Sequence, residues 1–246
     1  ESLSPSRRIR VLGSLTHPLI RPPVFNRGAF LYSRAMDTLV LGIDEVGRGA
    51  LAGPVVVGAC ALPLLAQEKT VLRWLLRETG VELKDSKKLS QKQREKIAPA
   101  LREAFLWGVG IVESDIVDAG LTSSLKLAAD KAIAQLLQHA PGGIGVKVLA
   151  DAGLFHSKEK EYPTRRSVKA DEHYLEVAAA SVLAKVARDH LMRERAVEFP
   201  GYEWEQNVGY GTPAHVRGIQ KYGLTTQHRC TFCSKFLQSS GNQPMM

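Results

Sequence analysis

Short runs of β-branched and aliphatic residues recur along the chain and predict strands. Residues 38–44 and 54–62 form two such runs, joined by a short glycine-containing link, so they are expected to be neighbouring strands. Residues 107–114 predict a third strand. A later apolar run, 146–151, and the segment 165–171 predict a fourth and a fifth strand, and each of them ends in an acid. The pattern indicates a sheet with charged residues at several strand ends.

Apolar residues at helical spacing predict helices between and after these strands. A short helix is expected over 68–78, and Ser90 is the expected N-cap of a stronger helix over 91–106. A helix over 123–139 should lie against the sheet, and a long helix over 172–199, rich in small residues at its centre, should pack closely on it. With a shorter C-terminal helix, this order indicates an α/β or α+β domain without internal repeats.

Four acids stand at the ends of predicted strands, namely Asp44, Glu45, Asp151 and Asp171. Charged residues are kept off buried strands unless they are paired or bind a metal. Mg²⁺ prefers oxygen ligands and keeps several waters, so these carboxylates could hold two ions, whose charge would offset the repulsion between the acids. The alternative interpretation is that each acid is a solvated strand terminus, and spacing alone does not decide between the two.

A turn of Gly47, Arg48 and Gly49 follows the first two acids. Glycines let the backbone approach a ligand closely, and arginine offers a planar set of donors to phosphate or sugar oxygens. The turn is not the dinucleotide-binding fingerprint, because Gly53 stands one residue too far along and the segment continues into a strand rather than a helix. Taken alone, the turn is more readily explained as an ordinary β-turn.

The composition is ordinary for a globular chain, with 246 residues, 44% hydrophobic and 24% charged, and a net charge of +8. Six arginines and a single acid, Glu1, lie in residues 1–35, so the rest of the chain carries only +3. This first segment has scattered proline and glycine and no lasting period, and we expect a disordered extension outside the core. A leader, sequence upstream of a start at Met36, and an Arg-rich transit peptide are the alternatives for it.

Lys and Arg interrupt every hydrophobic run, so no segment predicts a membrane span. Cys60, Cys230 and Cys233 are too few and too unevenly spaced for a disulfide-stapled secreted fold, which favours a reducing compartment. We therefore expect a cytoplasmic location, or an organellar one if residues 1–35 are a transit peptide. Cys230 and Cys233 form C-x-x-C beside His228, but without a second pair they are interpreted as reduced thiols rather than as a zinc site.

Five segments together resemble ribonuclease HII, the type 2 ribonuclease H family, in family order and with comparable spacing. They read "GIDEVGRGALAGPVVVGAC", "LKDSKKLS", "ADAG", "VKADEHYLEVAAASVLAKVARD" and "GYGTPAHVRGIQKYG" and span about residues 38–232. The resemblance implies an α/β ribonuclease H-like fold, whose central mixed five-stranded sheet has three antiparallel strands followed by two parallel ones and is flanked by helices. Residues 36–246 would form this single catalytic domain, which includes a C-terminal helical segment.

The resemblance also implies a metal site. The family's four acidic site residues fall on Asp44, Glu45, Asp151 and Asp171, the acids noted above. They would hold two divalent ions, Mg²⁺ or Mn²⁺, one to position and acidify the attacking water and one to stabilise charge on the leaving 3′ oxygen. Asp189 lies deep in the predicted long helix and is expected to pair with a neighbouring base instead.

The family's substrate-reading residues fall on the glycine turn and beyond it. Its glycine-arginine-glycine element, which recognises the ribonucleotide 2′-hydroxyl largely through backbone groups, falls on Gly47, Arg48 and Gly49. Its tyrosine, which stacks on the sugar after the ribonucleotide, falls on Tyr210, and Lys87 would face substrate phosphate. The expected substrates are RNA/DNA hybrids and single ribonucleotides embedded in duplex DNA, cleaved on the 5′ side to leave a 3′-hydroxyl and a 5′-phosphate.

Other classes of function stay open on the residues alone. One is a non-catalytic nucleic-acid-binding module on the same fold, and another is a nucleotide-binding enzyme that uses the glycine turn as a phosphate cradle, which the glycine spacing disfavours. The sibling type HIII enzymes carry an additional N-terminal domain, for which residues 1–35 are too short and irregular. No clear clamp-binding motif is recognised in the C-terminal tail, no membrane partner is expected, and a monomer is expected.

Several other polar and aromatic residues receive structural interpretations. His215 and His228 are expected to be hydrogen-bonding histidines rather than proton shuttles. Trp74, Trp107 and Trp204 are expected to be packing residues rather than platforms for base stacking.

Overall fold

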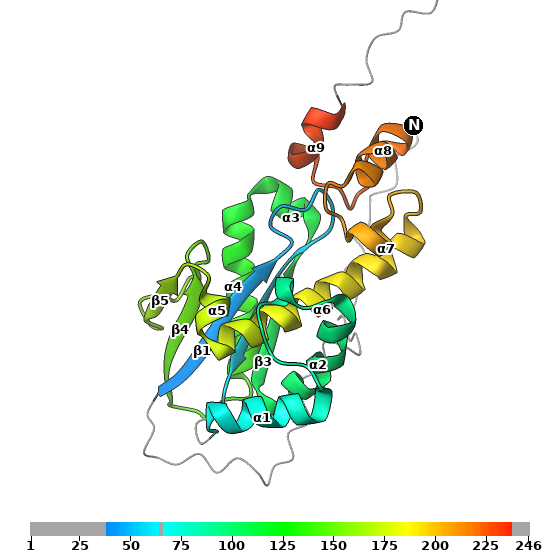
Figure 1. Ribbon diagram of the computed structural model, residues 1–246. Coiled ribbons are helices and arrows are strands. Elements are labelled where there is room, and N and C mark those ends of the chain that lie inside the picture. Colours follow the sequence, from blue (N-terminus) through cyan, green and yellow to red (C-terminus); the bar gives the residue numbers. More distant parts are fainter. Residues whose placement is uncertain (1–37, 64–65, 238–246) are drawn as a thin grey trace, which may run out of the picture.

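A five-stranded sheet forms the centre of the computed structural model, which describes residues 38–63 and 66–237 (Figure 1). The strands are β1 (Thr38–Val46), β2 (Val55–Ala61), β3 (Leu106–Val112), β4 (Gly145–Asp151) and β5 (Thr164–Ser167). They lie in the order β3-β2-β1-β4-β5. β1 and β3 pair antiparallel with β2, whereas β4 pairs parallel with both β1 and β5. The predicted mixed sheet is confirmed, while the predicted extension over 1–35 lies outside the described residues.

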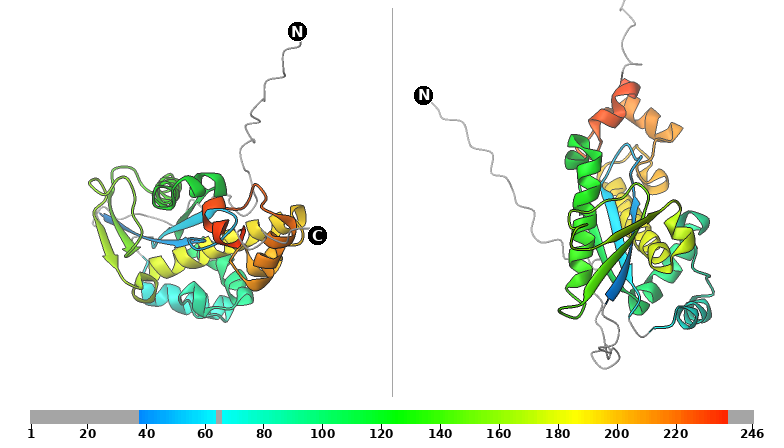
Figure 2. Two further views of the ribbon diagram at one scale, coloured as in Figure 1. Left: turned by 90° about the horizontal axis from the view of Figure 1, so that it is seen from above. Right: turned by 90° about the vertical axis from the view of Figure 1, so that its left-hand side faces the viewer.

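Helices cover both faces of the sheet. The right-hand view of Figure 2 shows α4 on one face and α6, with α1 and α2, on the other. A short 3₁₀ helix, η2 (Ser86–Lys88), precedes α2. The helices are α1 (Glu68–Thr79), α2 (Gln91–Ala104), α3 (Ser114–Ala119), α4 (Leu121–Leu137), α5 (Ala170–His173), α6 (Leu175–Glu198), α7 (Trp204–Asn207), α8 (Pro213–Tyr222) and α9 (Cys230–Leu237).

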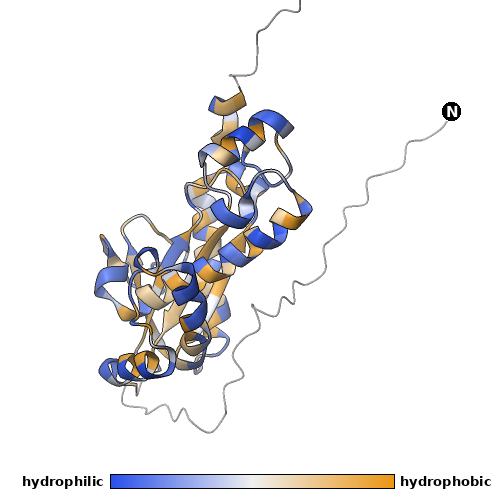
Figure 3. Ribbon diagram, turned by 45° about the vertical axis from the view of Figure 1, so that its right-hand side comes forward, coloured by the Kyte–Doolittle hydropathy of each residue, from blue (hydrophilic) through white to orange (hydrophobic). Residues whose placement is uncertain are grey.

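Strand alternation divides the buried residues between two cores. Leu39, Leu41 and Ile43 of β1 belong to the core beneath α4, so the even-numbered residues between them point to the face that α6 covers. On that face α6 lies very close to the sheet, because a Cβ at Gly58 of β2 would stand only 2.3 Å from the carbonyl oxygen of Ala180. The strands are apolar between the two helical layers, as Figure 3 shows.

Two helix predictions are borne out by local chemistry. Ser90 caps α2 in a full capping box, in which its hydroxyl accepts from the Gln93 amide and the Gln93 side chain accepts from the Ser90 amide. In α1, Leu75 is fully buried in the core beneath α6, with Leu72 packed against that core. Helix α1 therefore contributes to packing.

The predicted fifth strand is too long, and Asp171 does not stand at a strand end. β5 ends at Ser167, after which Val168 is 71% exposed and Lys169 adopts a left-handed conformation with φ of 55°. The chain turns there, and Asp171 lies in the short helix α5. The predicted helix over 172–199 also begins late, because Tyr174 is extended and separates α5 from α6.

The C-terminal part contains three helices where the sequence suggested one. Figure 1 shows the end of α6 and helices α7, α8 and α9 beyond one end of the sheet, where they enclose a third apolar core. Thr212 caps α8 and Pro213 occupies its first turn, a start signal that the sequence carries but that we did not use. The buried members of this core are Leu51, Ala52, Met192, Tyr202, Trp204, Val208, Ile219 and Cys233.

Among the helices of the described residues, none is long and apolar enough to cross a membrane.

Candidate active site

Two of the predicted acids meet because their strands are parallel neighbours. Ile43 of β1 pairs with Ala150 of β4, so Asp44 and Asp151 follow at adjacent strand ends and point to the same face of the sheet. That face is the one beneath α6. Asp44 is only 7% exposed, because the start of α6 covers it, whereas Asp151 is half-buried.

The third acid, Asp171, reaches the same place from α5. Lys169 ties the turn before α5 to β4, because its amide donates to Asp151 Oδ1 at 3.0 Å. Its left-handed conformation is unusual for a residue with a side chain and brings the chain back over the strand ends. Asp171, two residues later, therefore stands beside the ends of β1 and β4.

The pKa shifts of Asp44 and Asp171 indicate that these carboxylates lie close enough to repel one another. Burial raises the pKa of Asp44 to about 7, and the charges of Glu45 and Asp171 add to that rise, while a hydrogen bond from Ser181 opposes it. Burial also raises the pKa of Asp171, and Asp85 and Asp151 contribute in the same direction. Like charges in a poorly hydrated site disfavour ionisation, so full ionisation of these acids is unfavourable without a neutralising charge.

Glu45 points to the other face of the strand but remains close to the group. Its Oε1 lies 3.3 Å from Nη1 of Arg48, the exposed arginine of the following turn. Its Oε2 is buried and has no hydrogen-bond partner among the residues that the structure describes. A buried carboxylate oxygen without a partner is costly unless something else binds it.

Lys87 lies among the acids. Burial lowers the pKa of Lys87, but the charges of Asp44, Asp85 and Asp171 outweigh it and raise the pKa above its ordinary value. Asp85 accepts the Lys87 amide at 2.8 Å and hydrogen-bonds Asp171. The sequence analysis did not select Asp85 as a candidate site residue. The sequence offered one indication, because Asp85 is the acid at the start of "DSKK", the segment that contains Lys87.

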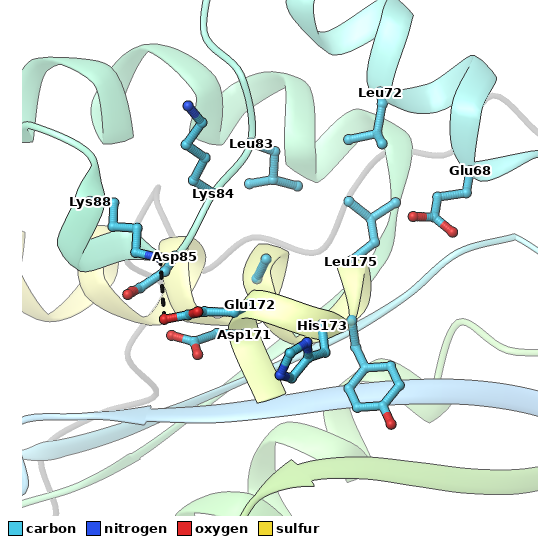
Figure 4. Close-up of a pocket in the computed structure, with 12 residues that line it drawn as sticks. Glu68, Leu72, Leu83, Lys84, Asp85, Lys88, Asp171, Glu172, His173 and Leu175 are labelled. Carbon is cyan, nitrogen blue, oxygen red and sulfur yellow. Dashed lines mark ion pairs between the residues drawn. The ribbon is translucent and has the colours of Figure 1, made fainter. Parts of the chain in front are cut away.

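A cavity of about 310 Å³ adjoins Asp171 and Asp85. Figure 4 shows it between α1, the segment that leads into η2, and α5, with Glu68 and Leu72 of α1 on its far side. Glu172 of α5 pairs with Lys88 at 3.2 Å, as the dashed line in Figure 4 marks. Helix α1 thus forms one wall of a cavity that opens next to the acids.

The glycine turn is held by two buried arginines that sequence reasoning did not identify. Gly47 has φ of +89°, and a Cβ there would lie 2.2 Å from Nε of Arg188. Arg188 donates to the carbonyls of Ala52, Pro54 and Val208, at 2.9 Å for Pro54. Arg229, which directly precedes α9, donates to the carbonyls of Arg48 and Gly53. Only the tertiary fold brings these arginines to the turn.

Tyr210 lies beside the same turn. The amide of Leu51, just after the turn, donates to the carbonyl of Gly209 at 2.8 Å. The Tyr210 ring is half-buried, with Nζ of Lys185 and the guanidinium carbon of Arg188 each 5.3 Å from its centre. The carbonyl of Tyr210 lies 3.0 Å from Nδ1 of His215.

The structural interpretations of the other residues agree with the fold. His215 and His228 are buried, with their Nε2 atoms 3.2 Å apart, and Nε1 of Trp204 donates to Nε2 of His215. Asp189 pairs with Lys185 at 2.9 Å and with Arg94 at 3.6 Å, as expected. The three cysteines are free thiols.

The donor set at the acid cluster fits a hard divalent cation. Within the described part of the chain, no three His, Cys, Asp or Glu side chains form a ready-made cage for an ion. Mg²⁺ does not need one, because it binds through one or two carboxylates and keeps waters or substrate oxygens as its other ligands. Glu45 Oε2 has no hydrogen-bond partner among the described residues, and a cation near Asp44 would offset the burial and the like charges that raise the pKa of Asp44.

A mixed sheet in this order, with carboxylates at its central strand ends, is a ribonuclease H-like fold. The family description Ribonuclease HII matches residues 41–235. A curated ribonuclease HII of Pediococcus pentosaceus is 40% identical over 207 residues, which cover 82% of this chain and 72% of that protein. The chain belongs to the ribonuclease HII family of metal-dependent endonucleases, which act on RNA/DNA hybrids.

Solved structures agree with this assignment. The ribonuclease HII in the PCNA:RNase HII complex from Archaeoglobus fulgidus is 25% identical, with a TM-score of 0.63, over 84% of this chain and 98% of that one. Bst-RNase HIII in complex with Mn²⁺ is 20% identical, with a TM-score of 0.59, over 84% of this chain and 71% of that one. The second likeness concerns the fold alone.

Proposed function

We propose that this chain hydrolyses the phosphodiester bond on the 5′ side of ribonucleotides, in RNA/DNA hybrids and at single ribonucleotides in duplex DNA. The products would carry a 3′-hydroxyl and a 5′-phosphate. One observation carries the proposal: carboxylates from three separate elements, β1, β4 and α5, converge next to a glycine turn that is braced from behind. The reaction would take place within residues 36–246, proposed as one catalytic domain.

Asp44, Glu45, Asp151 and Asp171 would hold two divalent ions, Mg²⁺ or Mn²⁺. When bound, the ions would supply an acidified attacking water and charge stabilisation for the leaving 3′ oxygen. The carboxylates supply the negative charge that holds the cations, and their burial strengthens that attraction. Lys87, whose own charge is stabilised by these acids, would face a substrate phosphate.

The glycine turn would read the ribose. Gly49 is exposed, and nothing stands within 4 Å of the place where its Cβ would be, so main-chain groups there are open to a ligand. A 2′-hydroxyl distinguishes RNA from DNA at a given position, which lets the chain ignore base sequence. Tyr210 would stack on the sugar that follows the ribonucleotide, and Arg48 would donate to phosphate or sugar oxygens.

Cleavage of defined duplexes tests the proposal. With Mg²⁺, we expect a nick on the 5′ side of a single ribonucleotide, with the stated ends, and no cleavage of the all-DNA duplex. Asp44→Asn and Asp151→Asn should each lower the cleavage rate by more than about a hundredfold, since even partners of metal ligands are worth 10-fold to 100-fold. Asp115→Asn, the same change at an exposed acid on α3, is the matched control and should cleave normally.

Two outcomes would contradict the proposal. Retained activity in both Asp44→Asn and Asp151→Asn would remove the metal assignment. Tight binding of the hybrid by wild-type protein, with no cleavage in Mg²⁺ or Mn²⁺, would support the alternative of a non-catalytic nucleic-acid-binding module.

A further inference from the structure

Two buried serines from distant parts of the chain touch beside the acid cluster. The hydroxyls of Ser86 in η2 and Ser181 in α6 are 2.7 Å apart, and the two residues are 2% and 1% exposed. The main chain of Ser86 is held separately, because Nη1 of Arg94 donates to its carbonyl at 2.9 Å. Neither hydroxyl is free to turn toward solvent, so the contact is a fixed feature of the interior.

Ser181 lies in α6 beside a close approach of this helix to the sheet. Ser181 follows Ala180, whose carbonyl oxygen would lie 2.3 Å from a Cβ at Gly58. Gly58 is the residue of β2 that pairs with Asp44 of β1. Both point to the face beneath α6, so this turn of the helix lies directly over the Asp44 carboxylate.

Packing explains the alanines of this helix turn but not the serine. Residues 178–180 are all alanine, and close approach to the sheet requires only that they be small. A hydroxyl at Ser181 adds a polar group in a fully buried place, which is unfavourable unless it is hydrogen-bonded. It is bonded on both sides, to Ser86 and to the Asp44 carboxylate, where the bond favours the charged form of the acid.

The direction of the hydrogen bonds follows from the acceptor at the end. An ionised carboxylate can only accept, so the Ser181 hydroxyl donates to Asp44. The Ser181 oxygen is then left to accept, and the Ser86 hydroxyl donates to it. The chain Ser86 to Ser181 to Asp44 is thereby fixed in one direction and links η2, which also carries Lys87, to the first acid of the site.

We propose that Ser86 and Ser181 are positioning residues, which form a relay that orients the Asp44 carboxylate toward its cation. The inference rests on the proposed function of Asp44 as a cation ligand. Residues that hydrogen-bond a metal ligand fix its orientation and raise its affinity for the ion. The relay also explains why a serine interrupts the alanines of α6 at this position.

Cation binding by the whole protein tests the relay without reference to cleavage. Mn²⁺ alone would be titrated calorimetrically into wild type, Ser181→Ala, Ser86→Ala and the double variant. Ser181→Ala should raise the Kd by 10-fold to 100-fold, and Ser86→Ala should raise it less. The double variant should resemble Ser181→Ala, because the two hydroxyls act in series.

Ser124→Ala is the matched control. Ser124 is also fully buried in a helix, and its hydroxyl donates to the carbonyls of Gly120 and Ile116, far from the acids in sequence and on the opposite face of the sheet. This variant should melt at a lower temperature with an unchanged Kd for Mn²⁺. A Kd for Ser181→Ala that equals that of wild type, with a similar loss of melting temperature, would overturn the relay and leave only packing.

Asp44→Asn separates failure of the relay from failure of the proposed function. If Asp44→Asn abolishes Mn²⁺ binding and Ser181→Ala does not weaken it, the relay alone is wrong. If Asp44→Asn binds as tightly as wild type, the assignment of Asp44 as a ligand is wrong, and the relay falls with it. Ser86→Ala lies outside the helical core, so it keeps the relay testable even if Ser181→Ala folds poorly.

Discussion

The acid cluster and the region behind the glycine turn both bury charge, but only one of them satisfies it. Arg188 and Arg229 are 0% exposed, and each donates to several main-chain carbonyls of the turn and its neighbours. Asp44 is 7% exposed, and the charges of Glu45 and Asp171 add to the rise in its pKa. The first arrangement is complete within the chain, whereas the second would be completed by the proposed cation.

The pKa values of Arg229 and Asp44 show the same contrast. Burial, followed by the nearby charge of Arg188, lowers the pKa of Arg229 to about 9, so the guanidinium remains protonated at neutral pH. Burial and neighbouring acids raise the pKa of Asp44 to about 7, so its charge is disfavoured near neutrality. A buried charge that the fold satisfies serves structure, and one that it leaves unsatisfied marks a functional site.

The strongest way to break this contrast is to remove the charge of Asp44. Asp44→Asn should stabilise the metal-free protein at pH 8, although it abolishes cleavage. The folded pKa of Asp44 is about 7 and its ordinary value is 3.8, so its ionisation destabilises the fold increasingly from about pH 4 to pH 7. At 1.36 kcal/mol per pKa unit, the gain is on the order of 4 kcal/mol.

Chemical denaturation of the metal-free protein at pH 8 and pH 4 measures this effect. The advantage of Asp44→Asn should be present at pH 8 and disappear toward pH 4, where both states of the wild type bind the proton. Equal stability of variant and wild type at pH 8 would mean that the Asp44 charge is already satisfied by the fold.

Removing a buried arginine behind the glycine turn should have the opposite effect and destabilise the protein. Arg229→Met removes the donors for the carbonyls of Arg48 and Gly53, and buried acceptors without partners cost about 1–3 kcal/mol each. We expect the free energy of unfolding to fall by about 2–4 kcal/mol and the preference for ribonucleotide over deoxyribonucleotide substrate to weaken.

Arg193→Met is the control for this change. Arg193 pairs with Glu95 near the surface at 3.1 Å, where such pairs contribute about 1 kcal/mol or less. Urea unfolding of both variants measures the difference, and a loss in Arg229→Met no larger than that in Arg193→Met would contradict the bracing of the turn.

The smallest expected effect concerns the buried histidines that support Tyr210. Burial, followed by His215, lowers the pKa of His228 to about 4, and burial lowers the pKa of His215. The unfolded chain binds protons first, so their contribution is fully present above about pH 6.5 and is lost as the pH falls toward 4. In wild type this loss should be on the order of 1–2 kcal/mol.

His228→Asn isolates this contribution, because it removes one of the two titrating rings. Thermal unfolding across this pH range should show a shallower decline for the variant than for wild type. Parallel declines would indicate that the histidine pair does not titrate in this range.

Local pattern was enough to predict much of the fold. The β-branched runs around Leu41 and Val57 predicted neighbouring strands, and the capping residues at Ser90 predicted the start of α2, because both signals depend on residues close in sequence. The acids Asp44 and Asp151 were also predicted, since charge at the end of an apolar run is visible in the sequence.

Errors arose where the chain's path depends on distant contacts. Asp171 was assigned to a strand end because the segment before it ends in an acid, as the earlier strands do, but the amide of Lys169 binds Asp151 and the chain turns into α5. Asp85 was overlooked although it stands directly before the lysines of "DSKK", and Ser181 was overlooked because nothing in its own segment shows that it faces the acids of other elements.

The sequence by itself therefore determined the elements, the acids and the glycine turn, since periodicity, capping and charge are local properties. Only the tertiary structure decided which buried charges are satisfied. Strand register sets Asp44 beside Asp151, and long-range packing brings Arg188 and Arg229 to carbonyls more than a hundred residues away. Those contacts follow from how whole layers pack, which no short stretch of sequence encodes.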